Sequence, residues 1–102
     1  MTTPAFKRIS VADAQNLLNE QTCTLADIRD GQSYAMSHVP GAAHLDGNSV
    51  EEFLKEANRE QPLIIYCYHG NSSQSAAQYF AEQGFAEVYS IDGGFEVWRQ
   101  QL

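Results

Sequence analysis

The sequence is poor in basic residues. Only six Lys and Arg stand against thirteen Asp and Glu, so the formal net charge of the 102-residue chain is -7, and the basic residues form no cluster. Proteins that bind nucleic acids or anionic membrane surfaces use Lys and Arg to neutralise phosphates. This composition therefore argues against nucleic acids and membranes as partners.

The chain also lacks a long hydrophobic segment. The longest apolar run is LIIYCY at residues 63–68, whereas a membrane-spanning helix needs about 20 apolar residues. The N-terminal residues MTTPAFKRIS contain no apolar stretch of the kind found in secretion signals. We therefore expect a cytoplasmic protein.

Cysteine is scarce as well. Cys23 and Cys67 lie far apart in the sequence, outside any CxxC pattern or Cys/His spacing typical of a zinc site. A chain of this size does not need a disulfide to hold its core together. We expect two free thiols and no metal ion.

What the chain does contain is the composition of one small globular domain. Hydrophobic residues make up 43%, aromatic residues 11% and charged residues 19% of the sequence, which is enough apolar material to fill an interior. Two domains would have only about fifty residues each, and chains of this length rarely divide into two cores. We expect a single domain over residues 1–102.

Segments typical of strands alternate along the chain with segments typical of helices. The run LIIYCY lacks polar alternation, which is typical of a central strand covered on both faces. Because strands that alternate with helices form right-handed crossovers, the pattern predicts a three-layer α/β domain with a parallel sheet of four or five strands and helices on both faces. Strands are expected at 23–28, 42–45, 63–68 and 88–91, and helices at 11–20, 31–36, 50–58, 74–83 and 95–102.

Several single residues indicate where these segments begin. Ser10 is expected to cap the first helix, and Asp30 the short helical turn that follows the first strand. Asn48, with Glu51 three residues later, resembles a capping box in front of the helix at 50–58. Among the aromatic residues, Tyr79 is expected in the core, together with Phe80, Phe95 and Trp98.

Cys67 closes the most apolar strand, directly before a turn that leads into a helix. Ligands of parallel sheets bind at the carboxyl ends of the strands. Backbone N–H groups at a helix start, together with the helix dipole, stabilise an anion or a thiolate there. A free cysteine is only about 3% thiolate at pH 7, and such surroundings lower its pKa. From strand composition alone, Cys67 fits equally well as a small buried hydrophobic residue.

The residues after Cys67 favour the nucleophile. Gly70 permits a left-handed backbone, Asn71 tolerates one, and Ser72 and Ser73 suit a helix start. A plain connection between a strand and a helix needs none of these features, so they indicate a cradle of amide groups beside the sulfur. Cys23, in contrast, opens a strand with no glycine-rich turn after it, and we interpret it as a packing residue.

The remaining polar residues point to chemistry less clearly than Cys67 does. His69 has two competing interpretations, and the others are interpreted as structural. His69 lies inside the proposed cradle, where it either donates a hydrogen bond or points to solvent. His38 and His44 flank a Pro-Gly turn and are interpreted as hydrogen-bonded or solvated surface residues. Asp27 and Arg29 are expected to form an ion pair or a backbone clamp at the carboxyl end of the strand 23–28. There they would brace the loop after Cys67, an interpretation that we favour over a direct catalytic role.

Three motifs, taken together, resemble the rhodanese family. LADIRDGQSYAMSHVPGAAHL is similar to the amino-terminal signature, IIYCYHGNSS to the active-site strand and loop, and VYSIDGGFEVW to the carboxy-terminal signature. They occur in the family's order and extend over practically the whole chain. One departure is Ser37, which stands where the family usually has a glycine before His38.

The resemblance implies a sulfurtransferase that works without a metal or an organic cofactor. Cys67 is implied as the catalytic thiolate, which takes the outer sulfur of thiosulfate, releases sulfite and holds a persulfide until a thiophilic acceptor removes it. The implied substrate-binding loop consists of Tyr68, His69, Gly70, Asn71 and Ser72. Cyanide is the usual assay acceptor of the family, and thioredoxin or another dithiol is a plausible cellular one.

Two alternatives remain from the same residues. A persulfide carrier would use Cys67 in the same way but deliver sulfur only to a protein partner. A phosphatase or arsenate reductase would need an Arg six positions after the cysteine to clamp the oxygens of its substrate. Ser73 occupies that position, which disfavours the phosphatase.

Overall fold

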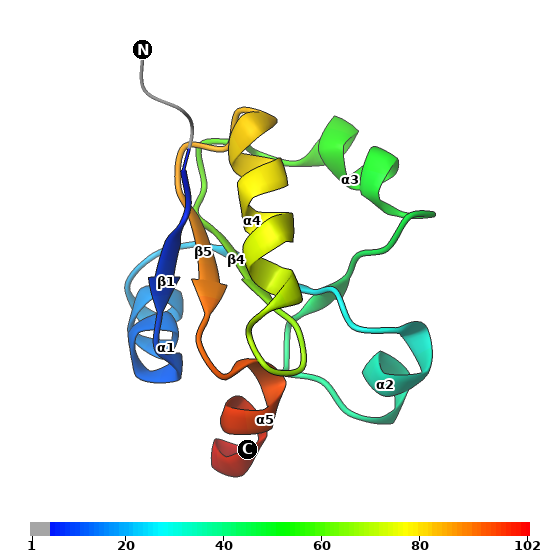
Figure 1. Ribbon diagram of the computed structural model, residues 1–102. Coiled ribbons are helices and arrows are strands. Elements are labelled where there is room, and N and C mark those ends of the chain that lie inside the picture. Colours follow the sequence, from blue (N-terminus) through cyan, green and yellow to red (C-terminus); the bar gives the residue numbers. More distant parts are fainter. Residues whose placement is uncertain (1–4) are drawn as a thin grey trace.

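The computed structural model describes residues 5–102 as a five-stranded parallel sheet with helices on both faces (Figure 1). The strand order is β1-β5-β4-β2-β3, so β4 is central, as its apolar run predicts. The strands are β1 (Lys7–Ile9), β2 (Thr24–Asp27), β3 (Ala43–His44), β4 (Leu63–Tyr66) and β5 (Val88–Ile91). The helices are α1 (Val11–Glu20), α2 (Gly31–Met36), α3 (Val50–Glu56), α4 (Ser72–Glu82) and α5 (Gly94–Trp98), followed by a 3-10 turn at Arg99–Gln101.

The side chains of β4 alternate between two hydrophobic clusters, one on each face of the sheet. Ile64 and Tyr66 pack with residues of α1 and α5, whereas Leu63 and Ile65 pack with residues of α3 and α4. All four side chains are fully buried. Because the central strand is apolar on both faces, it needs cover on both, and the predicted three-layer α/β arrangement is confirmed.

The helix starts follow the sequence signals in part. Ser10 accepts the N–H of Asp13 at 3.1 Å, and Asp30 accepts that of Ser33 at 3.0 Å, as expected of N-caps. The capping box predicted at Asn48 is wrong, because the residue before α3 is Ser49, which makes no side-chain cap bond. Asp46 instead caps the turn that leads into the helix. Its carboxylate accepts the backbone N–H groups of Asn48 at 2.8 Å and Ser49 at 3.0 Å, and α3 begins only at Val50.

Two further features differ from the sequence analysis. The sequence pattern predicts no strand at the position of β1, because its three mostly exposed residues at the sheet edge give no apolar pattern. It pairs in parallel with β5, with Lys7 opposite Tyr89. The expectation that Tyr79 lies in the core is also wrong, because this residue is 43% exposed on the surface of α4. No helix within residues 5–102 is long and apolar enough to span a membrane.

Candidate active site

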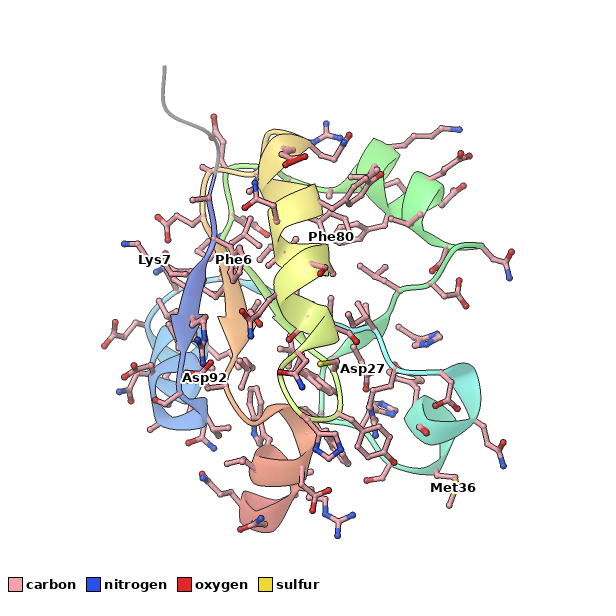
Figure 2. The ribbon with its side chains drawn as sticks, viewed as in Figure 1. Phe6, Lys7, Asp27, Met36, Phe80 and Asp92 are labelled. Atoms are coloured by element: carbon pink, nitrogen blue, oxygen red, sulfur yellow. The ribbon has the colours of Figure 1, made fainter. Side chains whose placement is uncertain are left out.

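Cys67 lies at the carboxyl end of the central strand, where the sequence analysis expects it. β4 ends at Tyr66, and the chain turns through residues 67–72, named here the Cys67 loop, whose last residue is the first of α4. Asp27 ends the neighbouring strand β2 opposite Tyr66, and Figure 2 shows it beside this loop. Cys67 itself is only 6% exposed. The structure therefore holds the sulfur in a fixed place at the sheet edge.

Three hydrogen-bonding groups converge on the sulfur of Cys67. The backbone N–H of Gly70 lies 3.2 Å from Sγ and that of Ser73 lies 3.3 Å from it. The side-chain oxygen of Ser73 is 3.4 Å from the same sulfur. Since backbone N–H groups only donate, this arrangement favours negative charge on Sγ.

The pKa of Cys67 reflects two opposing effects. Burial disfavours the charged thiolate and would raise the pKa, and it is the largest single influence on this thiol. The hydrogen bonds from Ser73, together with the backbone N–H groups of Gly70 and His69, outweigh it jointly, so the pKa lies below the ordinary cysteine value. The thiolate fraction at neutral pH is therefore increased.

Gly70 gives the Cys67 loop its shape. Its φ is +94°, in the left-handed region, and a Cβ at this position would lie 2.9 Å from the backbone nitrogen of Gly93 and 3.0 Å from the carbonyl oxygen of Ile91. Gln74 donates from its side chain to the Gly70 carbonyl at 2.9 Å. A glycine is therefore required here both for the backbone angle and for the close approach of the next turn.

The start of α5 holds the carbonyl groups of the Cys67 loop. The N–H of Phe95 donates to the Cys67 carbonyl at 2.8 Å, and that of Glu96 donates to the Tyr68 carbonyl at 3.0 Å. A Cβ on Gly94 would collide with the backbone of Cys67 and Tyr68. Because α5 takes up these carbonyl oxygens, the paired glycines before it are part of the site, a role that the sequence analysis did not assign.

Asp27 and Arg29 form the expected ion pair, and it is buried. The guanidinium donates to the Asp27 carboxylate at 2.7 Å and to the carbonyl of Ser37 at 2.6 Å. Its carbon lies 4.0 Å from the ring centre of Phe95 and 5.2 Å from that of Tyr68. Arg29 thus lies within cation–π distance of aromatic rings on both α5 and the Cys67 loop.

Ser37, where the family usually has glycine, fits without strain. Its φ is -169° and its ψ is 136°, which is extended backbone that any residue adopts. Its carbonyl still accepts the hydrogen bond from Arg29. The departure from the family pattern therefore does not disturb the ion pair.

The three histidines occupy different places. His38 donates from Nδ1 to the Tyr34 carbonyl at 2.7 Å, and His44 donates from Nε2 to the Arg29 carbonyl at 2.6 Å. Both are hydrogen-bonded away from the sulfur, as expected. His69 is exposed, and its ring centre lies 5.7 Å from that of Tyr68. It is the backbone N–H of His69, rather than its ring, that bears on the pKa of Cys67.

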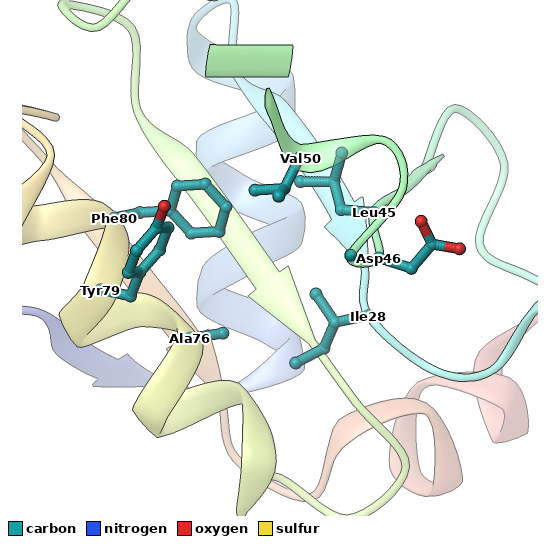
Figure 3. Close-up of a pocket in the computed structure, with 8 residues that line it drawn as sticks. Ile28, Leu45, Asp46, Val50, Ala76, Tyr79 and Phe80 are labelled. Carbon is teal, nitrogen blue, oxygen red and sulfur yellow. The ribbon is translucent and has the colours of Figure 1, made fainter. Parts of the chain in front are cut away.

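A hollow of about 130 Å³ lies over the sulfur, lined by Cys67, Tyr68, His69, Asn71 and Ser72. A larger apolar groove of about 280 Å³ lies elsewhere, between α4 and the segment that leads into α3 (Figure 3). This groove contains neither cysteine nor histidine. Of these two cavities, the smaller one is therefore lined by a cysteine and the larger one is not. Among residues 5–102, no three His, Cys, Asp or Glu residues gather as a metal site.

Ser73 contacts the Cys67 sulfur and Ser90 contacts Ser73, two roles that the sequence pattern does not predict. The sequence predicts Ser73 at the start of the helix as a possible cap, but α4 is preceded by Asn71, which has an ordinary right-handed backbone and makes no side-chain cap bond. The first-turn N–H of Ser73 donates to Cys67 instead. Ser90 lies on β5 with its Oγ 2.7 Å from that of Ser73. The available signal was a serine inside the otherwise apolar strand VYSI.

The chain belongs to the family of rhodanese-like domains, which matches residues 10–101. Over 94 residues it is 54% identical to the thiosulfate sulfurtransferase GlpE of Pseudomonas fluorescens, which covers 92% of this chain and 85% of that relative. The GlpE of Ectopseudomonas mendocina is 56% identical with the same coverage. The human single-domain sulfurtransferase TSTD1 has the same fold, with a TM-score of 0.80 over 99% of both chains at 19% identity. The family resemblance seen in the sequence is confirmed.

Proposed function

We propose that this protein is a thiosulfate sulfurtransferase in which Cys67 carries the transferred sulfur as a persulfide. The observation that carries the proposal is the convergence of the Gly70 and Ser73 N–H groups on a cysteine whose pKa is lowered. The names of the GlpE relatives, at more than half identity over most of the chain, support thiosulfate as the donor.

The first step transfers one sulfur atom to Cys67. The thiolate Sγ attacks the outer sulfur of thiosulfate and forms a sulfur–sulfur bond. The bond between the two sulfurs of thiosulfate breaks, and its electron pair leaves with sulfite. One negative charge remains on the outer sulfur of the persulfide, so charge and atoms balance without an added oxidant or reductant.

The second step returns Cys67 to the thiolate. A thiophilic acceptor attacks the outer sulfur, and the electron pair of the bond to Sγ returns to Cys67. The N–H groups around Sγ stabilise this leaving thiolate as they stabilise the attacking one. Each charge-assisted hydrogen bond contributes about 1.5–3 kcal/mol.

The exposed residues around the hollow provide the substrate site. Tyr68, His69, Asn71 and Ser72 line the space above the sulfur, and their backbone N–H groups are the proposed partners of the thiosulfate oxygens and of the persulfide. Asp27 and Arg29 act as structural support, because the guanidinium is fixed by its buried partner and lies near the ring of Tyr68.

The proposed acceptors are cyanide in the assay and a dithiol, such as thioredoxin, in the cell. One thiol of a dithiol attacks the outer sulfur and takes it over as its own persulfide. The second thiol then attacks the inner sulfur of that persulfide, which forms a disulfide and releases the outer sulfur as hydrogen sulfide. Both cysteines of this chain are free thiols, which fits the reducing cytoplasm, where we propose that the protein works.

The phosphatase alternative has no support in this site. Its loop would require an Arg at position 73, but Ser73 is fully buried and its hydroxyl lies against the cysteine sulfur. Within the described part of the chain, no Lys or Arg lines the hollow. A phosphoryl group would therefore lack the guanidinium that its developing charge requires.

Intact mass measurement tests the proposal. After incubation with thiosulfate, the protein is expected to gain the mass of one sulfur atom, and cyanide is expected to remove it with formation of thiocyanate. Absence of the mass gain would contradict the proposal. A gain that cyanide and small dithiols leave in place would favour the carrier, which releases sulfur only to a protein partner.

A further inference from the structure

Ser73 and Ser90 form a buried pair of hydroxyl groups behind the sulfur. Ser73 belongs to α4 and Ser90 to β5, and both side chains are completely buried. Their oxygens are 2.7 Å apart, and the Ser73 oxygen is 3.4 Å from Sγ of Cys67. Ser90 thus contacts the reactive group only through Ser73. Burying two hydroxyls is unfavourable unless each finds a partner, so the three side chains form one hydrogen-bonded chain.

The direction of these hydrogen bonds depends on the charge of Cys67. Each hydroxyl has one proton to donate and lone pairs that accept. A neutral thiol donates to Ser73, which then donates to Ser90. A thiolate has no proton, so Ser73 donates to Sγ and Ser90 donates to Ser73. Ionisation of Cys67 therefore reverses both bonds.

We propose that Ser90 is a positioning residue that stabilises the thiolate of Cys67 through Ser73. When Ser90 donates to the Ser73 oxygen, it holds the Ser73 proton toward the sulfur and strengthens that bond, because successive hydrogen bonds polarise one another in a medium of low dielectric constant. The inference about thiolate stability stands on geometry alone. Its importance for sulfur transfer rests on the function proposed above.

Ser90 is expected to affect the two halves of the reaction differently. A thiol with a higher pKa is a stronger nucleophile once ionised, but it is a poorer leaving group. Loss of Ser90 therefore slows attack only where Cys67 is incompletely ionised. Loss of Ser90 also slows the discharge of the persulfide, in which Sγ must leave as a thiolate.

Other ionisable groups lie on the Cys67 loop and on the neighbouring strands and helices, and they remain unchanged when Ser90 is replaced. They set the background for any pH profile, and a comparison of variants removes their contribution. On the elements packed around the sulfur, these groups are Asp27 with Arg29, Tyr66, Tyr68, His69, Asp92 with Arg8, and Glu96.

The test is the pH dependence of alkylation of Cys67 by iodoacetamide, measured in Cys23→Ser protein so that only one thiol reacts. Relative to this parent, Ser90→Ala is expected to slow alkylation at neutral pH about threefold, and Ser73→Ala about tenfold. Both profiles move to higher pH, and neither variant reacts more slowly at the high-pH plateau. The control is Val88→Ala, which removes buried side-chain volume from the same strand but has no hydroxyl. It is expected to keep the parent midpoint.

A double variant tests whether Ser90 acts on Cys67 through Ser73. If Ser90 acts only through Ser73, then Ser90→Ala adds nothing in a Ser73→Ala background, whereas independent effects would multiply. A parent-like profile for Ser90→Ala, or a multiplied effect in the double variant, overturns the proposal. Should Ser90→Ala fail to fold, a parent-like profile for Ser73→Ala would overturn it as well, because the path from Ser90 runs through that hydroxyl.

Alkylation needs no thiosulfate, so it separates this proposal from the proposed function. A shifted profile in a protein that gains no sulfur from thiosulfate would leave the role of Ser90 standing and remove the sulfurtransferase. In the sulfur-loaded enzyme, Ser90→Ala is expected to slow discharge by cyanide about threefold at all pH values. Discharge at the parent rate would contradict the role of Ser90 in the leaving-group step.

Discussion

The two cysteines of this chain have the same side chain in opposite surroundings. Cys67 receives hydrogen bonds from two backbone N–H groups, at 3.2 and 3.3 Å. Cys23, between α1 and β2, instead donates its own S–H toward the carbonyl oxygens of Leu17 and Gln21, each 3.6 Å away. The backbone therefore offers donors to one sulfur and only acceptors to the other.

The pKa values of the two thiols follow this difference. Burial acts on both in the same direction, since it disfavours a thiolate. At Cys23 burial and the nearby charge of Glu87 together raise the pKa. At Cys67 the hydrogen bonds reverse the effect of burial and lower it. Burial alone therefore does not make a cysteine inert, because the direction of the surrounding peptide groups decides its ionisation.

Replacing each cysteine by serine is expected to have the largest effect of the changes that test this comparison. Cys67→Ser is expected to abolish both the persulfide and thiocyanate formation, because the nucleophile is lost while the loop amides remain. Cys23→Ser is expected to retain full activity. Both are measured by intact mass and a cyanide assay, with thermal unfolding to verify the fold. Sulfur transfer that depended on Cys23 and survived without Cys67 would invert the assignment.

Replacement of Arg29 tests the buried ion pair that supports the Cys67 loop. In the part of the chain that the structure describes, the surroundings of Cys23 contain no corresponding ion pair. Arg29→Met leaves the Asp27 carboxylate buried without a partner, and we expect a loss of about 3–5 kcal/mol in unfolding free energy. The exposed pair of Arg8 with Asp92 is the control, since Arg8→Met is expected to change stability by less than about 1 kcal/mol. Urea unfolding measures both. Equal losses would show that the buried pair does not hold this edge of the sheet.

Gly70→Ala is expected to make the surroundings of Cys67 more like those of Cys23. The new Cβ would meet the backbone of Gly93 and Ile91, so the turn must shift and its N–H would move away from the sulfur. We expect sulfur transfer to fall by at least about tenfold, since one hydrogen bond to a charged group is worth about that much. Cyanide assays at neutral pH measure the loss.

Gly41→Ala is the matched control for Gly70→Ala. Gly41 has a similar φ of +87°, but no atom lies within 4 Å of the position of its Cβ. It therefore carries the same backbone strain without the collision and is expected to keep its activity. If both variants lost activity equally, backbone strain rather than placement of the amide would explain the effect.

The local part of this comparison could be predicted from the sequence. The apolar run before Cys67 indicates a buried central strand, and the following glycine, asparagine and serines indicate a turn into a helix. The strand and turn lie within ten residues of each other, so short-range rules suffice for them. The absence of such a turn after Cys23 likewise predicts that the two thiols have different surroundings, as they do in the structure.

The long-range part could not be predicted from these rules. Ser90 reaches the sulfur only because β5 lies beside β4, and the amides of α5 reach the loop carbonyls only after the chain has folded back. The position of Arg29 near Phe95 depends on the same packing. These contacts arise between elements that are distant in the sequence. No local sequence pattern indicates which serine will reach the Cys67 site or which aromatic residue will lie near Arg29.

The pH dependence of alkylation sharpens the comparison of the two thiols directly. Because a lowered pKa means that the thiolate forms at lower pH, the rate at Cys67 is expected to rise and level off earlier on the pH scale than the rate at Cys23. Sulfur transfer is correspondingly lost as the pH falls through the pKa of Cys67. Mass spectrometry after digestion reports the two sites in one sample. The midpoints are compared, rather than the absolute rates, since access to the two sulfurs differs. Coinciding midpoints would contradict the comparison.

The smallest expected effect concerns the charge of the attacking reagent. Iodoacetate carries a negative charge that iodoacetamide lacks, so their rate ratio reports the local potential at each sulfur. Glu87 bears on Cys23, whereas the donors around Cys67 favour an anion. At low salt we expect the ratio of the iodoacetate rate to the iodoacetamide rate to be about threefold higher at Cys67 than at Cys23.

Since the whole chain carries a net charge of -7, added salt should raise the iodoacetate rate at both sites. The increase should be larger at Cys23, where the salt screens the discrete charge of Glu87. A ratio at Cys67 that instead fell steeply with salt would point to a cationic group at the hollow, and Arg29→Gln would then show whether the charge is that of Arg29.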